Sequence, residues 1–222
     1  MRIHFTITLL FFMLLTAISC QKTVDTTEEK TVQLIENNFG LYTTEHNSLS
    51  VELQLDQFDD FDALIKRTEA IACNDSLPKI TLKHENELKN IYLRNPCWKN
   101  YACILIKQKN IIEIHNDTIN KLDEHFYPLD SLANVLRRDL ENNGQNPNLC
   151  ESPEKLLIYI SYDENGIEKL PKTLNLLTQT YKEIAGNTNL KIWLHKRILI
   201  SPPPPMPPEP DKIELIKDAI IN

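Results

Sequence analysis

Strand-like and helix-like segments alternate along this chain, and this alternation limits the folds that are open to it. Residues 49–55 place leucine or valine at every second position, which is the pattern of a strand with one buried face. Residues 58–72 then repeat apolar side chains at helical spacing, and Asp59, Asp60 and Asp62 fall in the first turn, where the helix dipole favours acids. Together these patterns predict an α+β fold of two layers, in which helices cover a sheet.

The rest of the first half continues the alternation. Lys79–Lys83 has the composition of a short strand. Glu87–Arg94 is expected to form a second helix that ends before Asn95 and Pro96, because a proline disfavours helical backbone in the residue before it. We therefore treat residues 41–100 as an N-terminal α+β region.

Residues 101–200 repeat this order more clearly, as a second α+β region. Cys103–Lys107 and Ile111–His115 are two apolar runs around Gln108–Asn110, which favours a hairpin. A helix is expected at 131–142, with Asp130 or Ser131 as its cap and Gly144 at its end, and a second helix is expected at 167–185, ending at Gly186. A buried strand is expected at 155–161 and a last strand at 192–200. The buried strand should lie centrally in one sheet, and both helices should pack on the same face of it.

Both regions thus show strand, helix, strand and helix in turn. A degenerate βαβα duplication would explain this order, and so would the ordinary alternation of elements in α+β proteins. The sequence leaves both explanations open.

The N-terminal segment has the features of an export signal. One basic residue, Arg2, precedes an apolar run from Phe5 to Ala17, which is shorter than the roughly 20 residues of a membrane-spanning helix. Residues 15–20 resemble a bacterial lipobox, so residues 1–19 are expected to be removed and Cys20 to carry a lipid anchor. The alternative is an ordinary signal peptide with an incidental cysteine. The predicted location is the cell envelope, on a membrane that faces the periplasm, with the leaflet left open.

Two further segments lie outside the α+β regions. Residues 20–40 begin with a polar stretch rich in threonine and glutamate, and they are expected to form a lipidated tether. Residues 201–222 contain a proline-rich stretch, Ser201–Pro210, and then a short closing helix that Asp211 can cap. Proline favours an extended polyproline backbone, so this stretch is either a stiff spacer or a docking strap for a partner.

The composition argues against several classes of function. A formal net charge of −7 disfavours nucleic acid as a partner. The four glycines are scattered and cannot build a phosphate-cradling loop or a nucleophile elbow. No nucleophile–base pair and no cluster with metal-ligand spacing can be assembled from the sequence. We therefore expect a protein that is not an enzyme and that has no cofactor and no bound metal.

Besides Cys20, the chain has four cysteines: Cys73, Cys97, Cys103 and Cys150. An even number of cysteines in an exported protein favours disulfides, and four cysteines allow three pairings among which the sequence does not choose. A bridge between Cys97 and Cys103 would require the chain to reverse direction between them.

A few polar or aromatic groups are candidates for a site. The acidic run at 57–62 lacks the alternating oxygens and turn glycine of a calcium loop, so a solvated helix start is favoured. Turn chemistry accounts for residues 163–165, and residues 123–125 are expected to form a loop rather than to line a cleft. Trp98 and Trp193 either stack on sugars or, as is commoner, pack internally.

Three stretches of the second half resemble the periplasmic domain of the ExbD/TolR biopolymer-transport family. They are CILIKQKNIIEIHNDTI, PLDSLANVLRRDLENNG and EKLLIYISYDENGIEKLPKTLNLLTQTYKEIAG, and they are similar in order to the hairpin, helix, strand and helix of that family. The resemblance covers about half of the chain and consists of apolar patterns. It implies an α+β periplasmic body that contacts peptidoglycan, an envelope motor protein or a second copy of itself.

The chain departs from this family at its N-terminus. Members of the family carry a proton-conducting aspartate on an N-terminal membrane helix, whereas the apolar run Phe5–Ala17 contains no acid. The resemblance therefore implies an accessory role in envelope transport or integrity, without proton conduction. The alternative is a periplasmic lipoprotein that binds a small molecule or a glycan on an unrelated fold.

Overall fold

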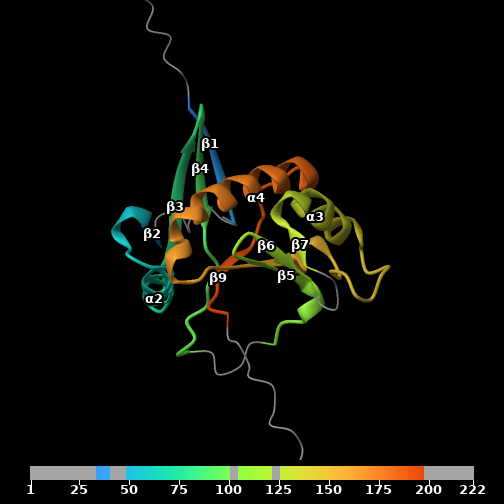
Figure 1. Cartoon of the computed structure of the whole chain (residues 1–222), viewed down its shortest axis with the longest axis horizontal. Coiled ribbons are helices and arrows are strands. Elements are labelled where there is room, and N and C mark those ends of the chain that lie inside the picture. The colour runs from blue at the N-terminus through green and yellow to red at the C-terminus, as the bar shows by residue number, and fades with distance from the viewer. Residues whose placement is uncertain (1–33, 41–48, 101–104, 122–125, 198–222) are drawn as a thin grey trace, which may run out of the picture. The chain divides into compact units, whose positions relative to one another are not determined.

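The computed structural model describes residues 34–40, 49–100, 105–121 and 126–197, which form two β-sheets and three α-helices (Figure 1). The chain has an α+β fold, as the sequence predicts. Several expectations fall outside the described residues: the signal peptide, Cys20, the start of the tether, Cys103, residues 123–125, the end of the last strand and the proline-rich tail.

The first sheet has four strands in the order β1-β4-β3-β2. Its strands are β1 (Ile35–Phe39), β2 (Ser50–Glu52), β3 (Leu77–His84) and β4 (Glu87–Tyr92). The antiparallel pair β3–β4 forms its centre, and β1 and β2 add to it in parallel. Because β1 lies within the segment expected to be a tether, the folded body begins earlier than the sequence indicates.

The expected helix at Glu87–Arg94 is wrong, because these residues form β4 and its extension. A run of eight residues fits a helical or a strand period, and here β4 has a hydrogen-bonded neighbour on each side. Lys89 reaches the covered face of the sheet, where its ammonium donates to Asn175 Oδ1 at 2.7 Å. The first region therefore ends in a strand, and it does not repeat the strand–helix order of the second region.

The second sheet has five strands in the order β7-β6-β5-β8-β9. They are β5 (Ile111–His115), β6 (Thr118–Asn120), β7 (Tyr127–Pro128), β8 (Leu157–Ser161) and β9 (Ile192–Leu194). Strand β8 lies inside the sheet and is parallel to both of its neighbours, β5 and β9. Strand β6 is antiparallel to both of its neighbours, β5 and β7. The interior position of β8 agrees with the strand expected at 155–161.

The hairpin of this sheet is not the expected one. Strand β5 pairs with β6, and Asn116 and Asp117 form the turn with φ of 46° and 63°. A two-residue hairpin turn needs positive φ, which Asn and Asp tolerate better than most residues. Residues 105–107 form no strand, and Leu105 is 93% exposed.

The three helices are α2 (Phe61–Ala72), α3 (Leu132–Glu141) and α4 (Leu170–Ala185). Asp60 caps α2 by accepting a hydrogen bond from the Ala63 amide at 2.7 Å, and α4 ends at Gly186 as expected. Ser131 holds the N-cap position of α3, but its side chain makes no cap bond. Helices α3 and α4 pack against each other on the same face of the five-stranded sheet (Figure 1).

The two sheets are joined directly. Leu93, which follows β4, forms a parallel bridge with Ile192 of β9, and the Arg94 amide donates to Ile192 O at 2.9 Å. One continuous apolar core includes side chains from both sheets and all three helices. The regions 41–100 and 101–200 are thus parts of one compact unit that begins at Leu34.

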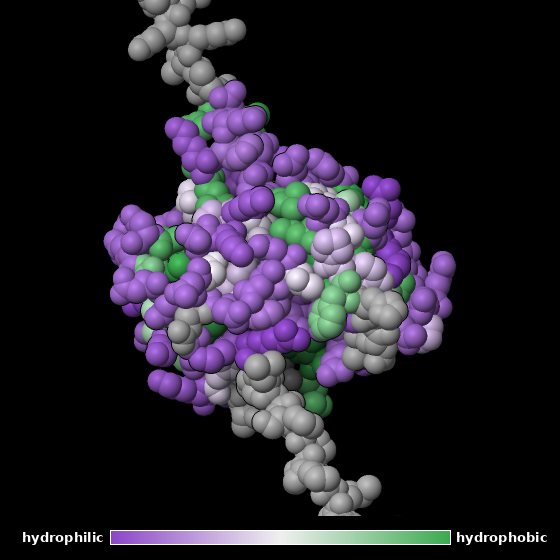
Figure 2. Space-filling model, viewed as in Figure 1, coloured by the Kyte–Doolittle hydropathy of each residue, from purple (hydrophilic) through white to green (hydrophobic). Residues whose placement is uncertain are grey.

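Hydrophilic side chains cover most of the surface in Figure 2. Among the described residues, no helix has the length and apolar character needed to span a membrane.

Candidate ligand-binding face of the five-stranded sheet

One face of the five-stranded sheet is packed against helices, and the other carries mixed aromatic and polar side chains. Successive side chains of a strand point to opposite faces. Ile112 and Ile114 of β5 and Ile158 and Ile160 of β8 are fully buried in the core beneath α3 and α4. Their neighbours in the strands therefore point to the opposite face, which we call the open face.

A cleft of about 250 Å³ lies on the open face. The residues that line it come from β5, β6, β8 and the segments beside β5 and β9: Gln108, Ile111, Glu113, Asn120, Tyr159 and His195. Pockets for drug-sized ligands typically measure about 300–1,000 Å³, so this cleft has room for a group of roughly one ring.

The Glu113 carboxylate of the cleft is bonded to a neighbouring amide and lies near a cation. Asn120 Nδ2 donates to Glu113 Oε2 at 3.2 Å, and Arg197 Nε lies 3.9 Å from Glu113 Oε1. The Glu113 side chain is 19% exposed, so its carboxylate is still reachable from solvent. The cleft thus offers amide and carboxylate groups that can hydrogen-bond hydroxyl groups of a ligand.

An aromatic row extends from the cleft across the open face. Tyr159 stacks on His195 with centroids 4.9 Å apart, and on Trp193 with centroids 5.5 Å apart. Trp98 meets Trp193 edge to face at 5.8 Å. The row follows from strand register, because Tyr159 of β8 lies opposite Trp193 of β9 and His195 follows two residues later.

Burial shifts the pKa values of the two ring side chains that line the cleft, His195 and Tyr159. It lowers the pKa of His195, and the nearby Glu113 carboxylate acts in the opposite direction. Burial also raises the pKa of the Tyr159 hydroxyl. Both groups are therefore neutral at neutral pH, and a neutral imidazole can donate one hydrogen bond and accept another.

The sequence identified part of this site. Trp98 and Trp193 were expected either to stack on sugars or to pack internally, and they lie in one row, with Trp98 44% exposed. Glu113, Tyr159 and His195 were missed. Tyr159 could have been found, since it is the one aromatic residue in the apolar run LLIYI, where its face of the strand departs from aliphatic packing.

The cysteines are now partly assigned. Cys73 and Cys97 form a disulfide with Cα atoms 4.6 Å apart, so Cys97 does not pair with Cys103. Cys150 is a free buried thiol that donates to Ser152 O at 3.1 Å, and burial raises its pKa. Four cysteines do not all pair as the even count suggested.

The acidic candidates are accounted for by local structure. Asp60 caps α2, and Asp62 forms an ion pair with Lys196. Asp163 accepts from Asn116 Nδ2 at 2.6 Å, and its carbonyl closes a turn with Gly166. Within the described ranges, no group of three or more His, Cys, Asp or Glu side chains is placed to hold a metal ion.

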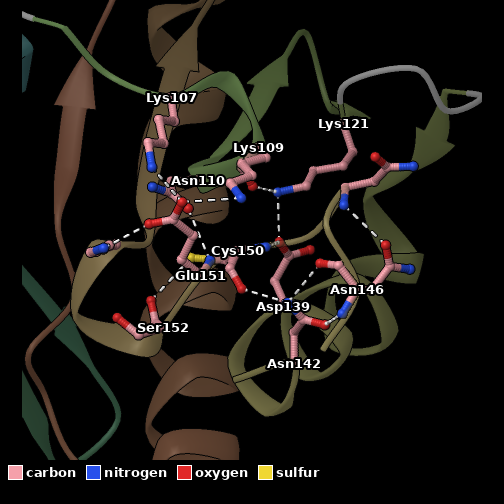
Figure 3. Close-up of polar contacts among 12 residues, drawn as sticks. Lys107, Lys109, Asn110, Lys121, Asp139, Asn142, Asn146, Cys150, Glu151 and Ser152 are labelled. Carbon is pink, nitrogen blue, oxygen red and sulfur yellow. Dashed lines mark hydrogen bonds and ion pairs between the residues drawn. The ribbon is translucent and has the colours of Figure 1, made fainter. Parts of the chain in front are cut away.

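A polar network, drawn in Figure 3, involves the residues on both sides of Gln108, which lines the cleft. Lys121 and Asp139, both fully buried, form an ion pair at 2.5 Å, and Lys121 also donates to the carbonyls of Lys109 and Ile111. Asp139 Oδ1 in turn accepts from the Cys150 amide at 3.0 Å. The strand start that carries Ile111 is thereby tied to α3 and to the segment after it.

Glu151 extends this network to the surface. Its carboxylate contacts Lys107, Lys109 and Lys155 at 2.6, 3.0 and 2.6 Å, and these ammonium groups hold its pKa far below the usual value. The Glu151 amide donates to Asn110 Oδ1 at 3.0 Å. Because Lys107 and Lys109 flank Gln108, these contacts fix the turn that supplies Gln108 to the cleft.

Comparisons with protein-family models, with curated proteins and with solved structures find no match to this chain.

Proposed function

We propose that this protein is a lipid-anchored cell-envelope protein that acts by binding rather than by catalysis, and that its body is ExbD/TolR-like. The order of a hairpin, then α3, β8 and α4, supports this proposal, although the hairpin is β5–β6 and not the one expected at Cys103–His115. The shared face of α3 and α4 and the interior position of β8 also support the proposal. The lipid anchor at Cys20 would keep this body at a membrane that faces the periplasm.

The cleft on the open face is the observation that supports a ligand class. A sugar ring has an apolar C–H face and a rim of hydroxyl groups. The aromatic rings of Tyr159 and His195 can contact the apolar C–H face. The side chains of Gln108, Glu113 and Asn120 can hydrogen-bond the hydroxyl groups. We therefore propose that the ligand is a glycan, and that the envelope glycan in question is the peptidoglycan strand.

A ligand titration tests this proposal. The full-length protein, extracted in detergent, would be titrated with the N-acetylglucosamine dimer while its intrinsic tryptophan fluorescence is recorded. Both tryptophans of the chain lie in the aromatic row, so binding in or beside the cleft should change their emission. We expect Tyr159→Ala to weaken binding about 10-fold, because it removes an aromatic ring that lines the cleft.

Phe126→Ala is the matched control, since Phe126 is a 63% exposed aromatic residue that adjoins β7 at the other edge of the same sheet. It should leave the affinity unchanged. A wild-type protein that shows no response up to about 10 mM sugar would contradict the proposal. Capture of an envelope motor protein or of a second copy of the chain, with no sugar response, would favour a protein partner instead.

A further inference from the structure

Trp98 belongs to the aromatic row but not to the cleft. Its ring stands almost perpendicular to that of Trp193, at 85°, and it is 44% exposed. The row therefore continues from the two stacked rings that line the cleft, through Trp193, to an accessible ring outside it. A ligand of one ring would fill the cleft without reaching Trp98.

The chain that carries Trp98 is bound to β9 by an unusual side-chain pairing. Asn95 Nδ2 donates to Leu194 O at 2.7 Å, and Asn95 Oδ1 accepts from the Leu194 amide at 3.0 Å. Together with the parallel bridge between Leu93 and Ile192 and the hydrogen bond from the Arg94 amide to Ile192 O, this pairing makes residues 93–95 run alongside β9. The open face is thus extended beyond the fifth strand.

A covalent bond fixes the same segment immediately before Trp98. Cys97 is joined to Cys73, which is the C-cap residue of α2. Trp98 is the next residue, and the turn after it is closed by a bond from the Asn100 amide to Cys97 O at 3.0 Å. The segment that carries this exposed tryptophan is therefore attached through Asn95 to β9 and through Cys97 to the end of α2.

We propose that Trp98 is a second stacking subsite for a sugar ring further along the ligand, and that the Cys73–Cys97 disulfide is the device that positions it. This inference rests on the proposed glycan binding and adds that the ligand is an oligosaccharide. A ring held in its binding position before the ligand arrives loses little conformational freedom on binding, so the restraint favours affinity.

The test compares two ligand lengths. The full-length protein would be titrated with the N-acetylglucosamine dimer and tetramer, and the ratio of the two affinities would be recorded by calorimetry. We expect the wild-type protein to bind the tetramer about 10-fold more tightly than the dimer. Trp98→Ala should reduce this ratio to about 1–2 while leaving the dimer affinity within about twofold, and Phe126→Ala should leave the ratio intact.

The positioning role of the disulfide is tested on the same ratio. Reduction of the folded protein, with its circular dichroism spectrum unchanged, should lower the ratio as Trp98→Ala does and spare dimer binding. Asn95→Ala loosens the other attachment of the segment and should lower the ratio in the same direction, which keeps the test available where reduction unfolds the chain.

The outcomes separate the two proposals. A wild-type protein that binds dimer and tetramer equally would overturn the second subsite and leave the proposed function standing. A ratio that survives both reduction and Asn95→Ala would overturn the positioning role. A wild-type protein that binds neither ligand would contradict the proposed function itself, and the inference with it.

Discussion

Lys121 and Asp139 form an ion pair from which solvent is excluded, and such a pair is sensitive to the loss of one member. Removing one partner leaves an uncompensated buried charge, which typically costs about 3–5 kcal/mol. Lys121 also donates to two backbone carbonyls, and Asp139 accepts from the Cys150 amide, so the pair is part of the backbone bonding around it.

We expect Asp139→Ala to lower the free energy of unfolding by about 3–5 kcal/mol in urea titrations. Lys79→Ala, which breaks a partly exposed pair with Glu52 and leaves the hydrogen bonds of Glu52 to Thr81 in place, is the matched control and should cost less than about 1 kcal/mol. Equal costs for the two variants would show that the buried pair has no special role.

His195 makes stability depend on pH. Its pKa in the folded protein is lowered by burial below the usual 6.5. The unfolded chain therefore binds a proton more readily than the folded protein does as the pH falls through 6.5, and the free energy of unfolding should decrease there. At higher pH both states are neutral at this residue and its contribution is fully present.

Urea titrations at about pH 7.5 and about pH 5.5 measure this effect. The loss of stability between the two pH values should be smaller in His195→Gln than in the wild-type protein. His84→Gln, at the exposed end of β3, controls for the loss of an imidazole elsewhere. An unchanged pH dependence in His195→Gln would refute the assignment.

At the scale of elements, the end of β1 shows how tightly the sheet edge is packed. Gly40 has a φ of 76°, and a Cβ there would lie 2.7 Å from Tyr92 O and 2.8 Å from Leu190 O, which are both backbone atoms. Gly186, at the end of α4, has a similar φ of 67° but has no atom within 4 Å of the same position.

The two glycines therefore separate backbone strain from steric clash. Gly186→Ala should cost about 1–2 kcal/mol, the usual penalty of a left-handed non-glycine residue. Gly40→Ala should cost clearly more, about 3 kcal/mol or above, because the backbone around it must also move. Thermal unfolding of both variants gives the comparison, and similar melting temperatures would contradict the packing at β1.

Sequence patterns predicted the three helices and the strands β3, β5, β8 and β9, and failed on β1, β4 and the hairpin partner of β5. Helices α2, α3 and α4 have apolar faces and recognisable ends such as Asp60 and Gly186, and strand β8 is a continuous apolar run. Strand β4 was mistaken for a helix, since its identity depends on neighbours in β1 and β3 that are distant in sequence. The hairpin was predicted around Gln108–Asn110, because two apolar runs flank these residues. The observed turn at Asn116–Asp117 is followed by the short strand β6, which has no comparable apolar run.

The candidate site could be predicted only in part for the same reason. Trp98 and Trp193 stand out as single residues, whereas the cleft arises from register between β5, β6, β8 and the segment after β9. The pairing of Cys73 with Cys97 likewise depends on how β4 leads back to α2.

For the whole molecule, the two sheets form one body, and the lipid anchor expected at Cys20 would attach that body to a membrane. Cys20→Ala should release the protein from membranes or leave its signal unprocessed, because stable anchoring requires the acyl chains. Membrane fractionation and the intact mass of the protein measure this. A variant that stays membrane-bound with an unchanged mass would contradict the lipid anchor.

We propose that the open face of the five-stranded sheet binds envelope glycan. Co-sedimentation of the full-length protein with purified peptidoglycan sacculi tests it most directly, with Tyr159→Ala and Phe126→Ala as the paired variants. We predict that the wild-type protein and Phe126→Ala sediment with the sacculi, that Tyr159→Ala stays in the supernatant, and that soluble N-acetylglucosamine tetramer displaces the bound protein. Equal sedimentation of all three proteins, or none by the wild-type protein, would contradict the claim.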